Sequence, residues 1–163
     1  MVALGSGGTA VVTLPTDTQI LVTRQFDAPR HLVYKVFTTP ELIKRWWSGG
    51  FGEVTVAEVD LRVGGRWRHV LVEGDTEVGF HGEYREIVRN ERIVCTEVYE
   101  GVPGGSEPAV CTYTFAEEGD RTRFTLLVQM ANTEDRDALI ASGMEAGMQK
   151  GYDLLEEVAI SLR

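Results

Sequence analysis

Five polar side chains in the middle of the chain could carry acid–base chemistry. They lie in segments whose residue pattern predicts β-strands, and they are His69, His81, Glu97, Tyr99 and Tyr113. A desolvated histidine or glutamate can exchange a proton near neutral pH, and a tyrosine hydroxyl can donate one. Strand tyrosines more often bury the ring and strand glutamates more often face water. We therefore predict no catalytic residue from the sequence.

The two histidines also raise the question of a metal site. His69 and His81 are equally distant from Asp75, so a three-residue turn would place them opposite each other across a hairpin. Tetrahedral zinc normally needs three or four protein ligands, and the sequence places no third one. Phosphate-loop, dinucleotide, GxSxG and HExxH motifs are also missing from the sequence. We expect neither a metal nor a cofactor.

The elements that position these side chains follow from the hydrophobic periodicity. Residues 20–26 predict a strand, and Pro29 and Pro40 each stand at the start of a short amphipathic helix. Between residues 53 and 130, segments rich in Val, Ile, Thr, Tyr and Phe are separated by turn residues, which predicts six antiparallel strands. Thr133 then caps a long helix that runs to the end of the chain.

Three glycines stand four residues apart in that last helix, at Gly143, Gly147 and Gly151. An apolar stripe runs beside them and consists of Ile140, Met144, Met148 and Tyr152. A glycine inside a helix costs about 1 kcal/mol relative to alanine, so a run of them needs an offsetting reason. That reason is either close packing of the helix on its neighbour or space for a small apolar ligand. We favour the space.

Charge and hydropathy exclude some classes of partner. The chain has 25 acidic and 16 basic residues, a formal charge of −9, which disfavours nucleic acid and anionic membrane surfaces. No run approaches the roughly 20 apolar residues of a membrane span, and the amino terminus lacks the basic region of a secretion signal. We expect a cytoplasmic protein that binds no nucleic acid and inserts into no membrane.

The length suits one domain. Residues 1–10 are small and glycine-rich and predict a flexible tail, and residues 11–163 predict a single folded unit. Cys95 and Cys111 flank the loop around Pro103 symmetrically, so they could face each other across a hairpin. We favour buried reduced thiols.

The adjacent tryptophans Trp46 and Trp47 predict a rim. On a helix their side chains diverge by about 100 degrees, so both cannot point into one core and one should lie near the surface. Ser48, Gly49, Gly50, Phe51 and Gly52 follow them. This segment could be a flexible gate for ligand access, or a helix end capped by glycine and packed on its neighbours.

Four motifs follow one another along the chain: FDAPRHLVYKVFTTPELIKRWW, the turn at Gly64-Gly65-Arg66-Trp67, the strand at residues 82–87, and Ser142-Gly143-Met144. In this order and spacing the chain from about residue 11 to residue 163 resembles the family of homologues of the activator of heat-shock-protein-90 ATPase. That family belongs to the START-like and polyketide-cyclase superfamily. The resemblance implies an α+β helix-grip fold, in which a seven-stranded antiparallel sheet, two short helices and a long C-terminal helix enclose a hydrophobic pocket.

The resemblance implies positions that line this pocket, and the alternation of strand residues adds to them. If Trp67 points inward then His69 does too, and Tyr113 alternates with two threonines and should face the core. The predicted ligand-binding residues are Trp46, Trp47, Trp67, His69, Tyr84, Tyr113, Met144, Met148 and Tyr152.

Three functions remain open at this point. The first is binding or carrying a small, mostly apolar molecule that is aromatic, polyketide-like or lipid-like. The second, implied by the family's name, is regulation of a heat-shock-protein-90-type ATPase, although the eukaryotic activators have a further domain that this sequence does not resemble. The third is a cyclase- or aromatase-type enzyme in the same pocket. We favour the first, in a monomer or weak homodimer.

Overall fold

The computed structural model describes residues 10–102, 105 and 107–163. In chain order the elements are β1 (Val11–Thr13), β2 (Gln19–Phe26), α1 (Arg30–Thr38), α2 (Pro40–Ile43), β3 (Glu53–Val59), β4 (Arg66–Glu73), β5 (Thr76–Val88), β6 (Arg92–Tyr99), β7 (Ala109–Glu118), β8 (Arg121–Gln129), α3 (Thr133–Ala141) and α4 (Met144–Ser161). The predicted tail lies outside the described residues except for Ala10. This residue is buried, and the Gln149 side chain bonds its N–H and its C=O at 2.9 and 2.7 Å.

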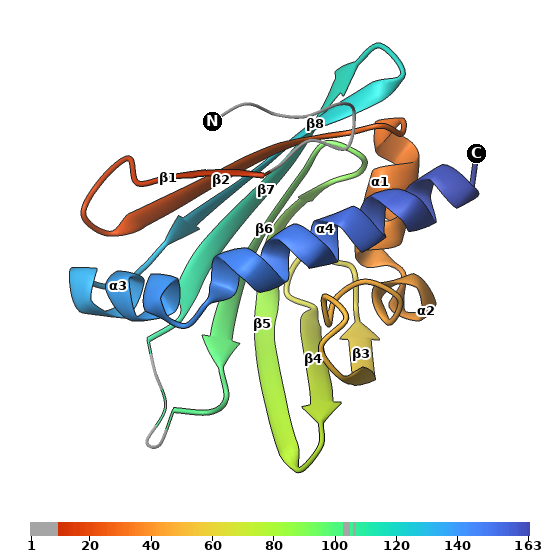
Figure 1. The fold of residues 1–163 in the computed structure, drawn as a ribbon. Coiled ribbons are helices and arrows are strands. Elements are labelled where there is room, and N and C mark those ends of the chain that lie inside the picture. Colours follow the sequence, from red (N-terminus) through yellow and green to blue (C-terminus); the bar gives the residue numbers. More distant parts are fainter. Residues whose placement is uncertain (1–9, 103–104, 106) are drawn as a thin grey trace.

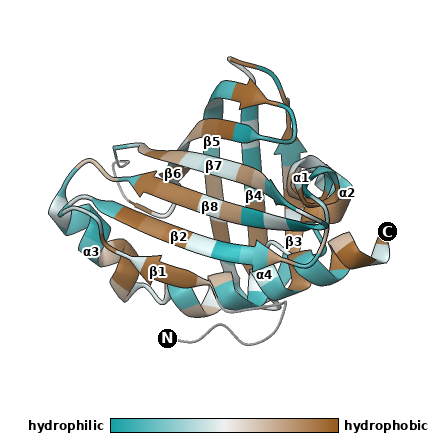
Figure 2. Cartoon of the chain, turned by 90° about the horizontal axis from the view of Figure 1, so that it is seen from above, coloured by the Kyte–Doolittle hydropathy of each residue, from teal (hydrophilic) through white to brown (hydrophobic). Residues whose placement is uncertain are grey.

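The strands form one antiparallel sheet in the order β1-β2-β8-β7-β6-β5-β4-β3. Helix α4 runs across one face of the sheet, with α3 at one of its ends and α1 and α2 towards the other (Figure 1). Viewed from above, the sheet is strongly bent (Figure 2). The predicted α+β class and antiparallel sheet are confirmed. The sheet has eight strands and not the predicted seven, because the short strand β1 pairs with β2 at its edge.

Buried and partly exposed residues alternate along β2, and the buried ones identify the face of the sheet that packs against α4. Every second residue of β2 is buried, and Ile20, Val22 and Phe26 have no exposed surface. The charged exception on this face is Arg24, which is 2% exposed. Its guanidinium lies 2.7 Å from Asp153 and 3.3 Å from Glu156, both on α4. This buried ion pair fixes the C-terminal half of α4 to the sheet.

The predicted C-terminal helix is wrong in one respect, because it is two helices. The backbone breaks at Gly143, whose φ of 85° is left-handed, between α3 and α4. A residue with a side chain adopts that conformation only with strain, so the glycine is what permits the break. The N-cap is Asn132 and not Thr133, since the Asn132 side chain accepts a hydrogen bond from the Asp135 N–H at 2.8 Å.

The two halves of α4 differ in their packing. Leu155, Val158 and Ala159 in the C-terminal half are buried in the core. At the middle of the helix, Tyr152 lies edge-on to Phe26 and Phe124, with ring centroids 5.9 and 5.2 Å away. The N-terminal half, from Met144 to Gly151, borders a pocket. The C-terminal half of α4 therefore packs in the core, whereas the N-terminal half covers the pocket.

Candidate functional site

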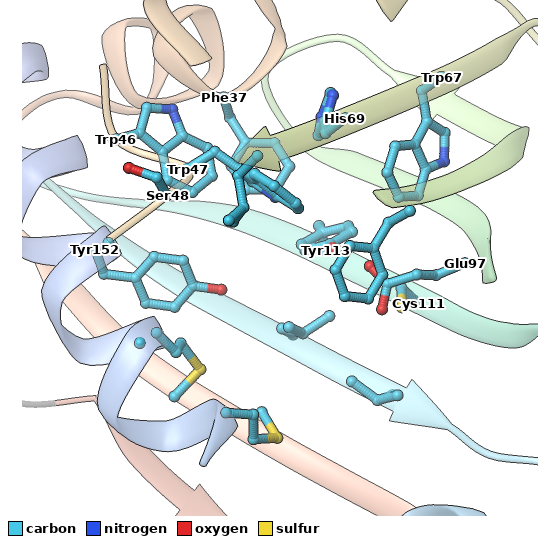
Figure 3. Close-up of a pocket in the computed structure, with 18 of the residues that line it drawn as sticks. Phe37, Trp46, Trp47, Ser48, Trp67, His69, Glu97, Cys111, Tyr113 and Tyr152 are labelled. Atoms are coloured by element: carbon cyan, nitrogen blue, oxygen red, sulfur yellow. The ribbon is translucent and has the colours of Figure 1, made fainter. Parts of the chain in front are cut away.

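The pocket beneath the N-terminal half of α4 has a volume of about 460 Å³. Its walls come from strands β4 to β8, from α1, from the turn after α2, and from the junction of α3 and α4. Figure 3 shows aromatic side chains from these separate elements around one space. Pockets of this size, with mostly apolar walls and a few polar groups, are typical of small-molecule sites.

All nine residues that the sequence predicted as ligand-binding lie on the wall of this pocket. The turn after α2 contributes Trp46 and Trp47, and β4 contributes Trp67 and His69. Strands β5 and β7 contribute Tyr84 and Tyr113, and α4 contributes Met144, Met148 and Tyr152. Their placement follows from the inward register of the strands. Their contact with a ligand remains a prediction.

The three glycines do not form one helical stripe. Gly143 is the break before α4, and Ile140 on α3 is 38% exposed and does not line the pocket. A Cβ built on Gly151 would lie 3.3 Å from the Trp46 carbonyl oxygen, so this glycine serves close packing. A Cβ on Gly147 would meet no atom within 4 Å, so this glycine leaves space in the pocket wall. Close packing therefore explains Gly151, and space for a ligand explains Gly147.

Both tryptophans line the pocket, and Trp47 is the one that lies nearer the surface. Trp46 is buried, and its indole N–H donates to the Val36 carbonyl at 3.1 Å. Trp47 is half-buried and lies edge-on to His69, with ring centroids 5.4 Å apart. Their side chains diverge, but the wall curves enough for each ring to border the pocket at a different place.

The segment after these tryptophans packs on α4. A Cβ on Gly49 would come 2.7 Å from the Gly147 carbonyl oxygen, so only glycine allows this approach. Phe51 is 43% exposed and carries the Lys150 ammonium 5.4 Å above its ring. The segment thus lies at the rim of the pocket, and its opening as a gate remains a prediction.

The predicted pairing of His69 with His81 is wrong. Strands β4 and β5 are joined by a two-residue turn that pairs Glu73 with Thr76, and His69 therefore pairs with Phe80. His81 points to the opposite face, where its Nδ1 lies 2.8 Å from the Glu100 carboxylate. Shortening a turn by one residue reverses the face of every side chain on the following strand. Within the described part of the chain, no cluster of three metal-ligating side chains occurs.

Of the five acid–base candidates, His81 lies on the face of the sheet opposite the pocket, and Tyr99 lies on the pocket's face but at the exposed end of β6. His69, Glu97 and Tyr113 line the pocket, whereas His81 and Tyr99 do not. Burial lowers the pKa of His69 to about 4, so its imidazole is neutral at pH 7. Burial raises the pKa of Tyr113 well above its ordinary value, so its hydroxyl stays protonated.

The carboxyl group of Glu97 is buried by the fold, and this burial could not be predicted from the local sequence. Burial raises the pKa of its carboxyl to about 7. The side chain keeps some accessible surface because it borders the empty pocket, although it lies deep in the protein. Carboxyl groups held near neutral pKa by burial are typical of functional sites.

Two buried thiols lie beside this carboxyl. Cys95 and Cys111 are direct partners across β6 and β7, and both are free, as predicted. Burial raises the pKa of Cys95 to about 12 and that of Cys111 well above its ordinary value. Both thiols are therefore protonated at neutral pH and are poor nucleophiles.

Sequence reasoning missed one major wall of the pocket. Phe37 on α1 lies 4.8 Å from Tyr113 and 5.5 Å from Trp46 between ring centroids. Its position on the apolar face of α1 marked it as a core residue. Only the placement of α1 against β7 shows that its ring also borders the pocket.

Across the described residues, no helix is both long enough and apolar enough to cross a bilayer.

A family profile described as "Activator of Hsp90 ATPase homolog 1-like protein" matches residues 27–159. No functionally curated protein matches the chain.

Solved structures of bacterial proteins share the fold. One from Rhodobacter sphaeroides has a TM-score of 0.85 at 21% identity, over 93% of this chain and 99% of the other. Proteins from Nitrosomonas europaea and Mycobacterium smegmatis both have a TM-score of 0.81 at 20% identity, over 91% of this chain and 98% and 95% of theirs. These similarities confirm the helix-grip fold.

Proposed function

This chain belongs to the family of Activator of Hsp90 ATPase homolog 1-like proteins, and from that premise we propose that it binds a small, mostly apolar molecule in the pocket beneath α4. The observation that carries the proposal is the preformed space of about 460 Å³ among aromatic, aliphatic and thioether side chains. A globular core normally fills such space, because an apolar void loses packing contacts.

The energetics of the pocket support a ligand of aromatic or lipid-like character. Burial of about 250 Å² of apolar ligand surface contributes about 6 kcal/mol before the costs of association. Met144 and Met148 have flexible, polarisable side chains that adapt to ligands of different shape. The break at Gly143 and the rim at Gly49 and Gly50 provide two places where the wall could move.

The methionines offer a direct test. The ε-methyl groups of Met144 and Met148 line the pocket, whereas Met130 packs on the core and does not line it. We expect neutral aromatic compounds to produce saturable chemical-shift changes at Met144 and Met148 and none at Met130. The variant Gly147→Leu, which fills the open space, should abolish these changes. Changes at all three methyl groups alike, or none at any, would contradict the proposal.

The family's name favours one second function, regulation of a chaperone ATPase. This function would use the outer surface and would leave the pocket methyl groups unaffected. Adding an Hsp90-type chaperone to the same labelled protein separates the two cases: broadening of surface amide signals without a pocket response to small molecules would favour it. Chemistry on a bound molecule would use the titratable groups of the pocket, of which Glu97 is the one with a pKa near neutrality.

The two cysteines bear on the compartment in which the protein acts. Cys95 and Cys111 face each other across neighbouring strands and yet are both free. Opposed free thiols persist in reducing compartments. This supports our proposal that the protein is cytoplasmic.

A further inference from the structure

The pocket contains one carboxylate and no lysine or arginine among its described wall residues. Ile93, Cys95 and Glu97 alternate along β6 and face inward, and they place the carboxyl group of Glu97 on the pocket wall. Figure 3 shows this group beside Cys111 and Tyr113. The other wall residues near it are apolar, aromatic or neutral.

Among the described residues, the carboxyl group of Glu97 takes part in no side-chain hydrogen bond or ion pair, and burial is the cause that raises its pKa. The side chain is only partly buried, and its oxygens are not among the fully buried unpaired polar atoms, so they remain open to the pocket. A carboxyl group that lies on the wall of a pocket and is not paired with another side chain is available to a polar group of a ligand.

The surroundings of Glu97 decide the charge of that ligand group. A ligand carboxylate would lie against another carboxylate, with no cation on the described wall to pair with it. An ammonium group would pair with Glu97, and the faces of Trp47, Trp67 and Tyr113 attract cations. Burial already disfavours the ionised carboxyl, so pairing with an ammonium group stabilises that form.

Building on the proposed function, we propose that the ligand of this pocket is a lipophilic amine, whose protonated nitrogen binds the carboxylate of Glu97 while its apolar body lies between α4 and the aromatic wall. This assigns Glu97 as the residue that selects ligands by charge. It separates amines from the fatty acids and aromatic acids that an apolar pocket of this size would otherwise accept.

A pH dependence follows, because Glu97 is the pocket group that titrates near neutrality. The titratable groups around it on β4, β5, β6, β7 and α4 are His69, Tyr84, Cys95, Cys111, Tyr113 and Tyr152. Burial holds the pKa of His69 at about 4 and raises those of the thiols and phenols. None of the six changes charge between pH 6 and pH 8.

An ammonium ligand binds the ionised form of Glu97 and therefore lowers its pKa. With a pKa of about 7 in the empty pocket, the ionised fraction falls from about 0.9 at pH 8 to about 0.1 at pH 6. Affinity for an amine should fall by about tenfold over this range. Binding at pH 7 should release about half a proton, which calorimetry in buffers of different ionisation enthalpy measures.

The test uses three probes of one shape: 2-naphthylmethylamine, 2-methylnaphthalene and 2-naphthoate. At pH 8 we expect the amine to bind about tenfold or more tightly than the hydrocarbon, and the hydrocarbon more tightly than the acid. The preference for the amine should largely vanish at pH 6. In Glu97→Gln it should vanish at both pH values while the hydrocarbon still binds. Glu83→Gln, which removes an exposed carboxylate from β5, should behave as the wild type.

The outcomes separate this inference from the proposed function. If the hydrocarbon binds and the amine binds no better, or if the preference survives in Glu97→Gln, the inference is overturned and the proposed function stands. If none of the three probes shifts the methyl groups of Met144 and Met148, the proposed function falls and the inference falls with it.

Discussion

At the scale of single residues, burial among aromatic side chains lowers the pKa of His69. Its ring lies between Trp47 and Trp67, with centroids 5.4 and 5.0 Å away. Its Nδ1 is buried without a hydrogen-bond partner among the described residues. Burial lowers the pKa of the imidazole from 6.5 to about 4, because the charged form has lost its solvation.

This shift makes the stability of the protein depend on pH. Between pH 6.5 and pH 4 the unfolded chain holds a proton on His69 that the folded protein lacks, so acidification favours unfolding. The contribution reaches about 3 kcal/mol by the lower end of that window. We expect His69→Phe to lose less stability than the wild type between pH 7 and pH 4, measured by urea unfolding. Equal losses in the two proteins would contradict the assigned burial.

These residues could be predicted only in part from the sequence. It identified His69, Glu97 and Tyr113 as the chemistry-bearing side chains that the pocket brings together, but it also included His81 and Tyr99. His81 was included because the sequence does not reveal the length of the turn at Gly74 and Asp75, which sets which residues of β5 face inward. Tyr99 faces the same side as Glu97, but it lies at the end of β6 and is 42% exposed. The raised pKa of Glu97 depends on desolvation by several strands, which no local pattern contains.

At the scale of elements, α4 combines packing and space within one helix. Gly151 approaches the backbone at Trp46, and one turn earlier Gly147 faces open space. The periodicity of the sequence predicted that Met144, Met148 and Tyr152 share the inner face of this helix, whereas Ile140, the fourth residue of the predicted stripe, lies on α3. The periodicity missed the break at Gly143 and the short strand β1, because one glycine conformation and three edge residues leave little periodic signal.

The two glycines form a matched pair for mutagenesis. Gly147→Ala should raise the free energy of unfolding by about 0.5 to 1 kcal/mol, since it improves helix propensity and meets no neighbour. Gly151→Ala should gain clearly less or lose stability, because its Cβ would lie 3.3 Å from the Trp46 carbonyl oxygen. Thermal and urea unfolding of both variants provide the comparison. An equal gain at the two sites would show that α4 does not pack on this turn as described.

At the scale of the whole molecule, the pocket exists because the fold holds α4 at one half only. The buried pair of Arg24 with Glu156 and the core around Leu155 fix the C-terminal half. The N-terminal half passes over the bent sheet, and residues of α3 and of the turn after α2 complete the pocket wall there. The resemblance to a known family predicted this arrangement as a whole, whereas periodicity alone predicted its separate elements.

The central claim is that this space accepts an apolar molecule, and a crystal of the protein soaked with 2-bromonaphthalene tests it most directly. The anomalous signal of bromine locates the compound independently of the protein density. We predict a bromine peak under α4, between Trp47, Tyr113 and Met148, and its absence in Gly147→Leu crystals treated in the same way. A peak confined to the outer surface, or a pocket closed by its own side chains, would contradict the account.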